Sequence, residues 1–183
     1  MDFKETLAEK KSTIVTKWIE SVLASYAADG ASFFMKQKDR FANPLGFAVK
    51  TGLAAVFEQL CGDRPAATMP PELAQFIKLR SVQTFAPSAA VGFVYQLKAI
   101  MISELGEATV LTAGQEWLAF DAKIDALALK LFDLYMEDRE LLCQVTVNEY
   151  KRKNDVKSRG QCPSSVLASN QEEKVELKVI RDC

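Results

Sequence analysis

The chain of 183 residues contains no histidine. This absence excludes Ser-His-Asp and Cys-His catalysis, histidine general acid–base chemistry, and histidine ligands for zinc or haem. The eight glycines are scattered and form no phosphate-binding loop. The longest uncharged run, residues 81–97, is interrupted by Gln83, Pro87 and Ser88 and is too short to span a membrane. We therefore expect neither a histidine-based enzyme nor a membrane-inserted protein.

Neither sign of charge is in clear excess, since the chain has 23 Lys and Arg residues and 24 Asp and Glu residues. A net charge of −1 provides no long-range attraction to nucleic acid or anionic lipid. The first residues, Met-Asp-Phe-Lys-Glu, carry charges where a signal peptide needs an apolar core. These features predict a cytoplasmic protein with no nucleic-acid partner. The basic cluster at residues 151–153 is interpreted as a complement to a helix dipole, with contact to an acidic partner as the alternative.

The four cysteines form no CxxC pair, and their spacing fits no zinc template. We expect no metal and no cofactor. Cys61 and Cys143 fall within helical patterns and are expected to be buried as small hydrophobic residues. Cys162 and Cys183 lie in a polar tail, where a redox role is the speculative alternative.

Apolar residues recur at helical spacing in six segments. The pattern predicts an all-α bundle with helices at about residues 4–27, 32–42, 44–61, 70–84, 87–105 and 114–153. Asn43-Pro44 suits the cap and first position of the third helix. Gly46 and Gly52 within that helix indicate close contact with a neighbouring backbone. The segment 87–105 is apolar almost all round its first half, so we expect it to be the most enclosed element.

The last predicted helix is too long for its domain. Nothing breaks a helix between Gly114 and about Lys153, and Thr112 with Gln115 offers a capping box at its start. At about 1.5 Å per residue, 40 helical residues span roughly 60 Å. A compact domain of about 150 residues has a diameter of only about 40 Å. Part of the helix must therefore protrude, kink or pack on a second molecule.

The composition changes after the long helix. We predict a folded domain at residues 1–153 and a flexible polar tail at residues 154–183, because residues 158–171 are rich in Ser, Gly, Gln and Asn. Alternating apolar and charged residues at 174–180 are typical of a short strand.

Several polar residues share helix faces with apolar ones. A buried charge needs a partner, so one interpretation pairs Arg80 or Arg139 with Asp133 across helices. The alternative is a small central pocket in which Arg80, Gln83 and Phe93 bind a ligand. No nucleophile, base and orienting group stand out together, so we do not expect an enzyme.

Asp138 interrupts the apolar stripe of the last helix between Leu134 and Leu141. A polar residue in such a seam often sets register or oligomeric state. The other interpretation is that the helix leaves the core and meets water there. We predict a protein interface formed by Leu134, Asp138, Leu141, Leu142 and Val145.

Three segments carry a family resemblance: residues 38–46, residues 77–94, and residues 127–139 with Val147-Asn-Glu149 following. Together they resemble the N-terminal sensor domain of the stressosome co-antagonist proteins, the RsbRD N-terminal domain family. The resemblance covers about Phe3 to Lys153. It implies a globin-like all-α fold without haem, paired as a homodimer, with a last helix that leads into a STAS domain. The 30 residues after Lys153 are too few for a STAS domain, so we expect a stand-alone member.

The favoured interpretation is a non-catalytic sensor or regulatory module for the stress response, acting through dimerisation and through contacts of its last helix with an unknown protein partner. Two alternatives remain. One is an accessory or adaptor subunit of an anaerobic, sulfur-metabolising redox complex that uses the tail cysteines. The other is a small-molecule binding protein.

Overall fold

The structure is a computed structural model that describes residues 3–26, 34–35, 37, 39–62, 68–83 and 85–158. The chain divides into two compact units, Met1–Tyr135 and Met136–Cys183. Within the described ranges there are six helices and no strand, which confirms the all-α class and the long last helix. No helix among these residues is both long enough and apolar enough to cross a membrane.

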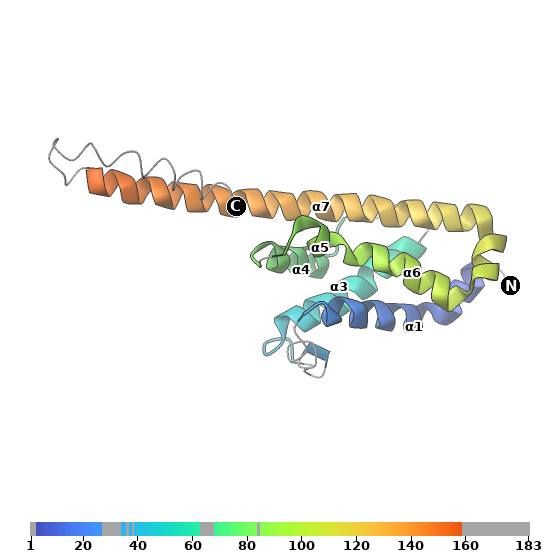
Figure 1. Cartoon of the computed structure of the whole chain (residues 1–183). Coiled ribbons are helices and arrows are strands. Elements are labelled where there is room, and N and C mark those ends of the chain that lie inside the picture. Colours follow the sequence, from blue (N-terminus) through green and yellow to red (C-terminus); the bar gives the residue numbers. More distant parts are fainter. Residues whose placement is uncertain are drawn as a thin grey trace. The chain divides into compact units, whose positions relative to one another are not determined.

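The helix boundaries follow the expected order of elements (Figure 1). They are α1 (Phe3–Ala24), α3 (Pro44–Cys61), α4 (Pro71–Ser81), α5 (Pro87–Val91), α6 (Phe93–Leu105) and α7 (Glu107–Ser158). Residues 32, 33, 36 and 38 of the helix expected at residues 32–42 lie outside the described residues. Phe34 and Met35 are helical, but residues 40–42 form a turn, so that helix does not reach Ala42 as expected.

Asn43 sets the start of α3, as its sequence position predicts. Its side-chain Oδ1 accepts a hydrogen bond from the backbone N–H of Gly46 at 2.8 Å. Its Nδ2 donates to the backbone carbonyls of Phe34 and Gln37, each at 2.9 Å. The buried amide therefore satisfies a free N–H of the first turn and ties the preceding segment to the helix.

Helix α3 packs closely against α4, which confirms the contact expected from its glycines. A Cβ atom at Gly52 would lie 2.7 Å from the backbone nitrogen of Leu73, which belongs to α4. Half of the α3 residues are buried, among them Val49, Leu53 and Phe57. The glycine thus allows two helix backbones to approach at a distance that any side chain would prevent.

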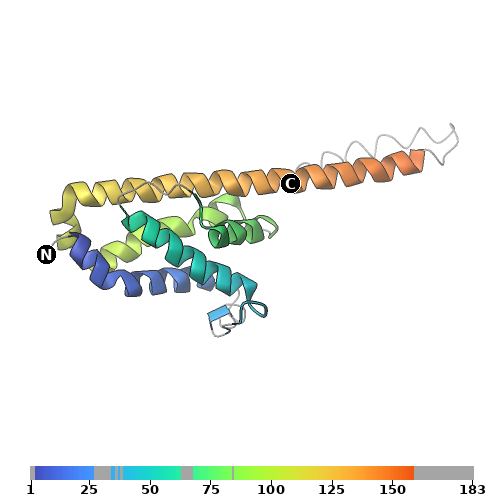
Figure 2. The ribbon, with the colours of Figure 1, turned by 180° about the vertical axis from the view of Figure 1, so that it is seen from behind.

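Helices α5 and α6 replace the single helix expected at residues 87–105. One residue, Gly92, separates them, and its backbone angles (φ −56°, ψ −20°) stay close to helical values. Helix α6 lies between α1 and the part of α7 that belongs to the first unit (Figures 1 and 2). Tyr95 and Ile102 are nevertheless exposed, so the expectation that this is the most enclosed element was wrong. Helix α3 buries a larger share of its residues.

Helix α7 consists of a short helical segment, residues 107–113, which was not expected, and the long helix expected from Gly114. The capping box was wrong, because the Thr112 hydroxyl donates to the carbonyl of Ala108 inside the helix. A kink occurs instead at Gly114, where φ is +33° and ψ is −89°. That backbone conformation is costly for a residue with a side chain. Beyond the predicted boundary at Lys153, the helix continues to Ser158, and the strand expected at 174–180 lies outside the described residues.

Two lysines join the first-unit part of α7 to its neighbours within that unit. Lys98 of α6 donates to Asp121 at 2.8 Å and to Asp125 at 2.7 Å, both on α7. Desolvation lowers the pKa of Lys98, but the hydrogen bonds and charges of the two carboxylates outweigh it, so the net pKa is raised. Lys123 of α7 donates to the carbonyls of Leu60 and Gly62, at 3.0 and 2.7 Å, and so caps the end of α3.

Replacing Gly52 with alanine tests the close approach of α3 and α4. We expect Gly52→Ala to lower the free energy of unfolding by about 1–3 kcal/mol, because the new methyl group would displace the α4 backbone. Gly62→Ala is the matched control, since its Cβ would lie 3.4 Å from the nearest atom and its φ is −72°. Urea denaturation followed by circular dichroism measures both. Equal stability of the two variants would show that the helices are not in such close contact.

Candidate functional site

Arg80, in the last turn of α4, is the one charged side chain that is buried among the described residues. Only 1% of its surface is exposed. A guanidinium removed from water is strongly unfavourable unless its charge and its donors find partners. The groups around Arg80 therefore determine whether this part of the first unit can fold.

Hydrogen bonds hold Arg80 to two other segments. Its Nη2 donates to the Ser25 hydroxyl at 2.7 Å, and its Nε donates to the Tyr26 hydroxyl at 3.4 Å. Its Nη1 donates to the backbone carbonyls of Ala89 at 3.1 Å and Ala90 at 3.0 Å. Ser25 and Tyr26 follow α1, and the two alanines belong to α5. One side chain thus joins α1, α4 and α5.

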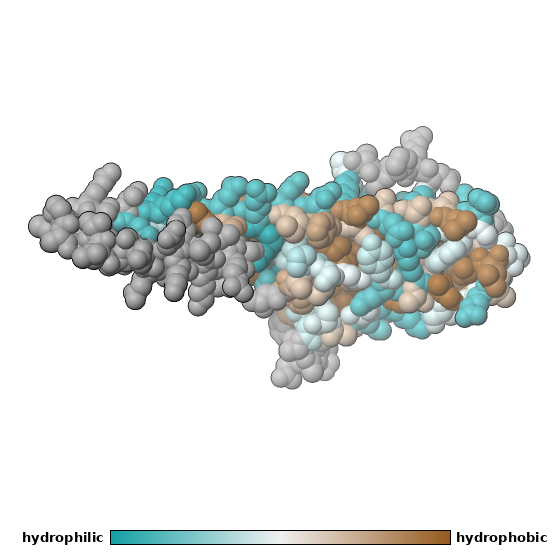
Figure 3. Space-filling view, turned by 45° about the horizontal axis from the view of Figure 1, so that its top comes forward, coloured by the Kyte–Doolittle hydropathy of each residue, from teal (hydrophilic) through white to brown (hydrophobic). Residues whose placement is uncertain are grey.

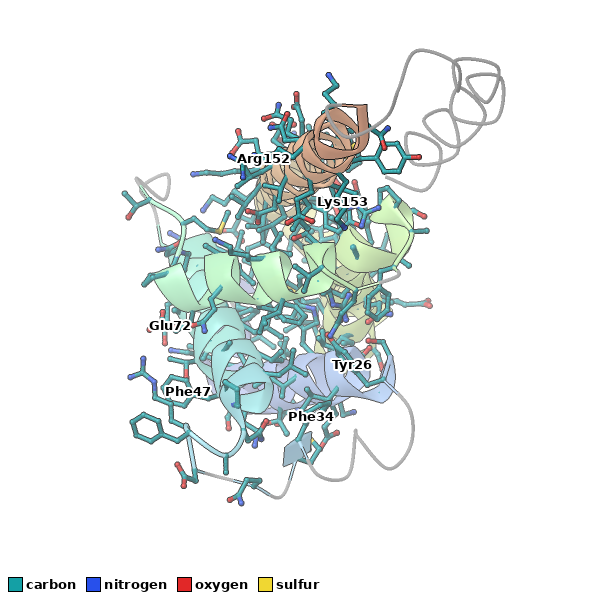
Figure 4. The ribbon with its side chains drawn as sticks, turned by 90° about the vertical axis from the view of Figure 1, so that its left-hand side faces the viewer. Tyr26, Phe34, Phe47, Glu72, Arg152 and Lys153 are labelled. Atoms are coloured by element: carbon teal, nitrogen blue, oxygen red, sulfur yellow. The ribbon has the colours of Figure 1, made fainter. Side chains whose placement is uncertain are left out.

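Four aromatic rings surround the guanidinium. The distances from Cζ of Arg80 to the ring centroids are 4.7 Å for Phe76, 4.9 Å for Phe85, 5.2 Å for Phe93 and 5.5 Å for Tyr26. The faces of aromatic rings attract cations at such distances. We call Arg80 and these four rings the arginine cluster. Tyr26 also packs edge to face on Phe34, with 5.5 Å between the ring centroids (Figure 4).

One interpretation of the sequence paired Arg80 or Arg139 with Asp133, and the structure does not form the pair of Arg80 with Asp133. Asp133 is exposed on α7, and in the part of the chain that the structure describes Arg80 contacts hydroxyls, carbonyls and rings but no carboxylate. Opposite charge was the only sign of a partner in the sequence. Several neutral acceptors and ring faces together can also stabilise a buried guanidinium.

The three residues predicted to bind a ligand do come together. Arg80 contacts the ring of Phe93, and the Tyr26 hydroxyl links Arg80 to Gln83 by donating to Oε1 of Gln83 at 3.5 Å. Side chains of the arginine cluster fill the space next to the guanidinium. Binding of a ligand by these residues stays a prediction. Tyr26, which connects them, was not singled out in the sequence because it resembled one more apolar residue of the first helix.

Tyr135 connects the arginine cluster to α7. Its hydroxyl donates to the backbone carbonyl of Phe85 at 2.9 Å, and the Phe85 ring lies against Arg80. Only 1% of Tyr135 is exposed. It is the last residue of the first unit, so the cluster contacts the end of the first-unit part of α7.

The predicted interface residues divide between the two units. Leu134 packs partly against the core of the first unit. The other four belong to the second unit, where Leu141 is 56% exposed and Val145 is 48% exposed, while Asp138 and Leu142 are half-buried. In the described part of that unit, α7 is the sole element, so no other described helix or strand of that unit covers these side chains.

A further apolar face of α7 lies within the first unit. Leu118, Leu129 and Phe132 are 59%, 65% and 42% exposed. Their spacings of eleven and three residues place them on one side of a helix. Figure 3 shows apolar residues among hydrophilic ones on the side of the first unit that carries α7. This face does not stand out in the sequence, because the regular apolar stripe of the helix is the one that faces the core.

Cys61 and Cys143 were expected to be buried, but both are only partly buried. Cys61 ends α3 and packs against the core. Burial, and then the nearby charge of Glu58, raises the pKa of its thiol from 9.0 to about 11. Cys61 therefore stays protonated at neutral pH and is a poor nucleophile.

Cys162 and Cys183 lie outside the described residues, so their predicted redox role is not tested. Among the residues that the structure describes, no three Cys, Asp or Glu side chains gather as a group that could hold a metal ion.

Comparison with known protein families gives one match. The model of the RsbT co-antagonist protein rsbRD N-terminal domain matches residues 12–149. The chain therefore belongs to this family of regulatory sensor domains, as the sequence resemblance indicated. None of the curated proteins and none of the solved structures matches the chain.

A conservative substitution tests the arginine cluster. We expect Arg80→Lys to lower the free energy of unfolding by about 2–4 kcal/mol, because one ammonium group cannot replace the forked donors and leaves buried acceptors unpaired. Lys78→Arg is the matched exchange on the exposed side of α4 and should change stability by less than about 0.5 kcal/mol. Denaturant unfolding measures both. If the two exchanges cost the same, the hydrogen bonds of Arg80 do not stabilise the fold.

The raised pKa of Cys61 predicts slow alkylation in the folded chain. At pH 8 its thiolate should be about 100-fold scarcer than in the unfolded chain, and labelling should accelerate about tenfold per pH unit up to about pH 10. Maleimide labelling with peptide mass spectrometry, in buffer and in guanidinium chloride, measures the two rates, with Cys61→Ser as control. Equal rates in both solvents would contradict the assignment.

Proposed function

We propose that this chain is a non-catalytic sensor or regulatory module that acts through self-association and protein contacts of helix α7. Its membership of the rsbRD N-terminal domain family supports the regulatory role. The exposed apolar residues of α7 support the role of that helix.

The observation that carries the proposal lies in the second unit. Leu141 and Val145 expose apolar side chains there, on a helix to which the described part of that unit supplies no second element. A stretch of helix that packs on nothing is only weakly stabilised in water, because most helical stability in proteins comes from packing an apolar face. A partner that covers this face would supply the missing packing. A second copy of the chain is the simplest such partner.

We place the input of the sensor at Arg80, Gln83 and Phe93. A ligand that competes for the donors of Arg80 would loosen its contact with the Phe85 ring. Because Tyr135 donates to the backbone carbonyl of Phe85, the change would reach α7 next to the start of the second unit. The core could in this way bias the association of α7 without any chemical reaction.

Charged substitutions on the exposed apolar face test self-association. We expect the intact chain to be a dimer at tens of micromolar concentration, and the variant Leu141→Glu/Val145→Glu to be a monomer, because pairing would bury two carboxylates. Thr146→Glu adds a charge at an exposed position about 100° further round the helix from Val145 and should leave the dimer intact. Size-exclusion chromatography with light scattering measures the molecular mass.

Two outcomes would contradict the proposal. One is an intact chain that stays a monomer at high micromolar concentration. The other is a Leu141→Glu/Val145→Glu variant that forms the same dimer as the intact chain. Circular dichroism of each variant confirms that the first unit remains folded.

A further inference from the structure

The second-unit part of α7 has opposite charges at its two ends. Residues 137–140 are Glu, Asp, Arg and Glu, with a net charge of −2, and residues 151–153 are Lys, Arg and Lys, with a net charge of +3. Between them Glu149 is the single charged residue, and the apolar residues Leu141, Leu142, Val145 and Val147 lie there. The basic side chains are exposed at the end of the helix, where Arg152 and Lys153 extend from it (Figure 4).

The helix dipole accounts for only one of these clusters. Basic residues near a helix C-terminus complement the dipole, and α7 ends at Ser158. The acidic cluster lies in the middle of α7, more than 20 residues after the kink at Gly114, where the dipole of the helix start has no effect. The carboxylates of Glu137 and Glu140 are exposed there, so the acidic cluster needs another explanation.

The spacing relates the two clusters to the apolar face. Asp138, Val145 and Arg152 are separated by steps of seven residues, and such steps keep side chains on one side of a helix. Val145 is the midpoint between the other two positions. A two-fold axis that passes Val145 perpendicular to the helix therefore exchanges the acidic end with the basic end.

We propose that residues 137–153 of α7 pair with the same residues of a second copy in antiparallel orientation, with Val145 at the centre. The proposal rests on the self-association proposed above and adds its orientation and register. In this arrangement Asp138 of each copy faces Arg152 of the other, and the apolar residues of the middle cover one another. Opposite charges at both ends of a short apolar seam specify register and orientation.

Parallel pairing of the same residues would be unfavourable. It would place two ends of charge −2 beside each other and two ends of charge +3 beside each other. Like charges brought together at an interface oppose association and act against that arrangement. The charge pattern thus favours the antiparallel form over the parallel form of the same dimer.

Charge reversal in the full-length chain tests the orientation. The acid-end variant is Glu137→Lys/Asp138→Lys, and the base-end variant is Lys151→Glu/Arg152→Glu/Lys153→Glu. In antiparallel pairing each variant alone places like charges together, so its dimer dissociation constant should rise about tenfold or more at low salt. The combined variant restores opposite charges and should return to within about threefold of the unchanged chain. Analytical ultracentrifugation measures the constants.

A parallel dimer gives a different result. In a parallel dimer, reversing the charges at one end of the helix only replaces one pair of like-charged ends by another. All three variants would then associate as the unchanged chain does. That result would overturn the inference. The self-association would still stand, because a dimer would still be observed. A monomeric unchanged chain, with α7 covered by some other segment or by nothing, would overturn both proposals.

Cross-linking gives an independent readout of register. In a background with all four cysteines replaced by serine, Asp138→Cys and Arg152→Cys are placed in separate chains of different mass. Oxidation of the mixture should join the two different chains by a disulfide between positions 138 and 152. Cross-links only between identical chains would show parallel pairing and overturn the inference.

Discussion

Arg80 can remain buried only because several segments of the first unit supply its partners at once. Ser25 and Tyr26 after α1, the carbonyls of α5, and the rings of α4, α6 and Phe85 must all be in place before the guanidinium loses its water. This requirement makes the arrangement of these segments cooperative, since no single pair of them satisfies the charge. The same cluster holds Phe85, whose carbonyl accepts the hydrogen bond from Tyr135 of α7. The buried charge thus extends its influence to the helix that we propose to carry the output.

The first unit buries a charged side chain, whereas the second unit exposes apolar ones. The described part of the second unit is a helix on which Leu141 and Val145 expose apolar side chains and whose charges are divided between its two ends. Within the first unit, the requirements of a charged side chain are met by neutral neighbours. Within the second unit, no other described helix or strand covers the exposed apolar side chains of α7. We therefore propose that another molecule covers them. A regulatory domain of the rsbRD N-terminal family needs no catalytic group to transmit a signal if its core biases how such a helix associates.

The sequence predicted those features that depend on local chemistry. Asn43-Pro44 marked the start of α3, and Gly52 indicated the close approach of α4, because capping and the lack of a side chain act within a few residues. The one-residue break at Gly92 was missed, since its backbone angles stay close to helical values. The kink at Gly114 lies where the sequence placed the start of the long helix, but the helical segment before it was not predicted. The partners of Arg80 were missed for a different reason. They come from segments up to 55 residues away, and a carbonyl or a ring face has no signature in a search for opposite charges.

The central claim is that a partner molecule covers the second-unit part of α7. Hydrogen exchange of the intact chain, measured at several protein concentrations, tests it most directly. We expect amides of residues 141–150 to become more protected as concentration rises, while amides of α3 and α4 in the first unit stay unchanged. Protection of residues 141–150 that is the same at every concentration would contradict it.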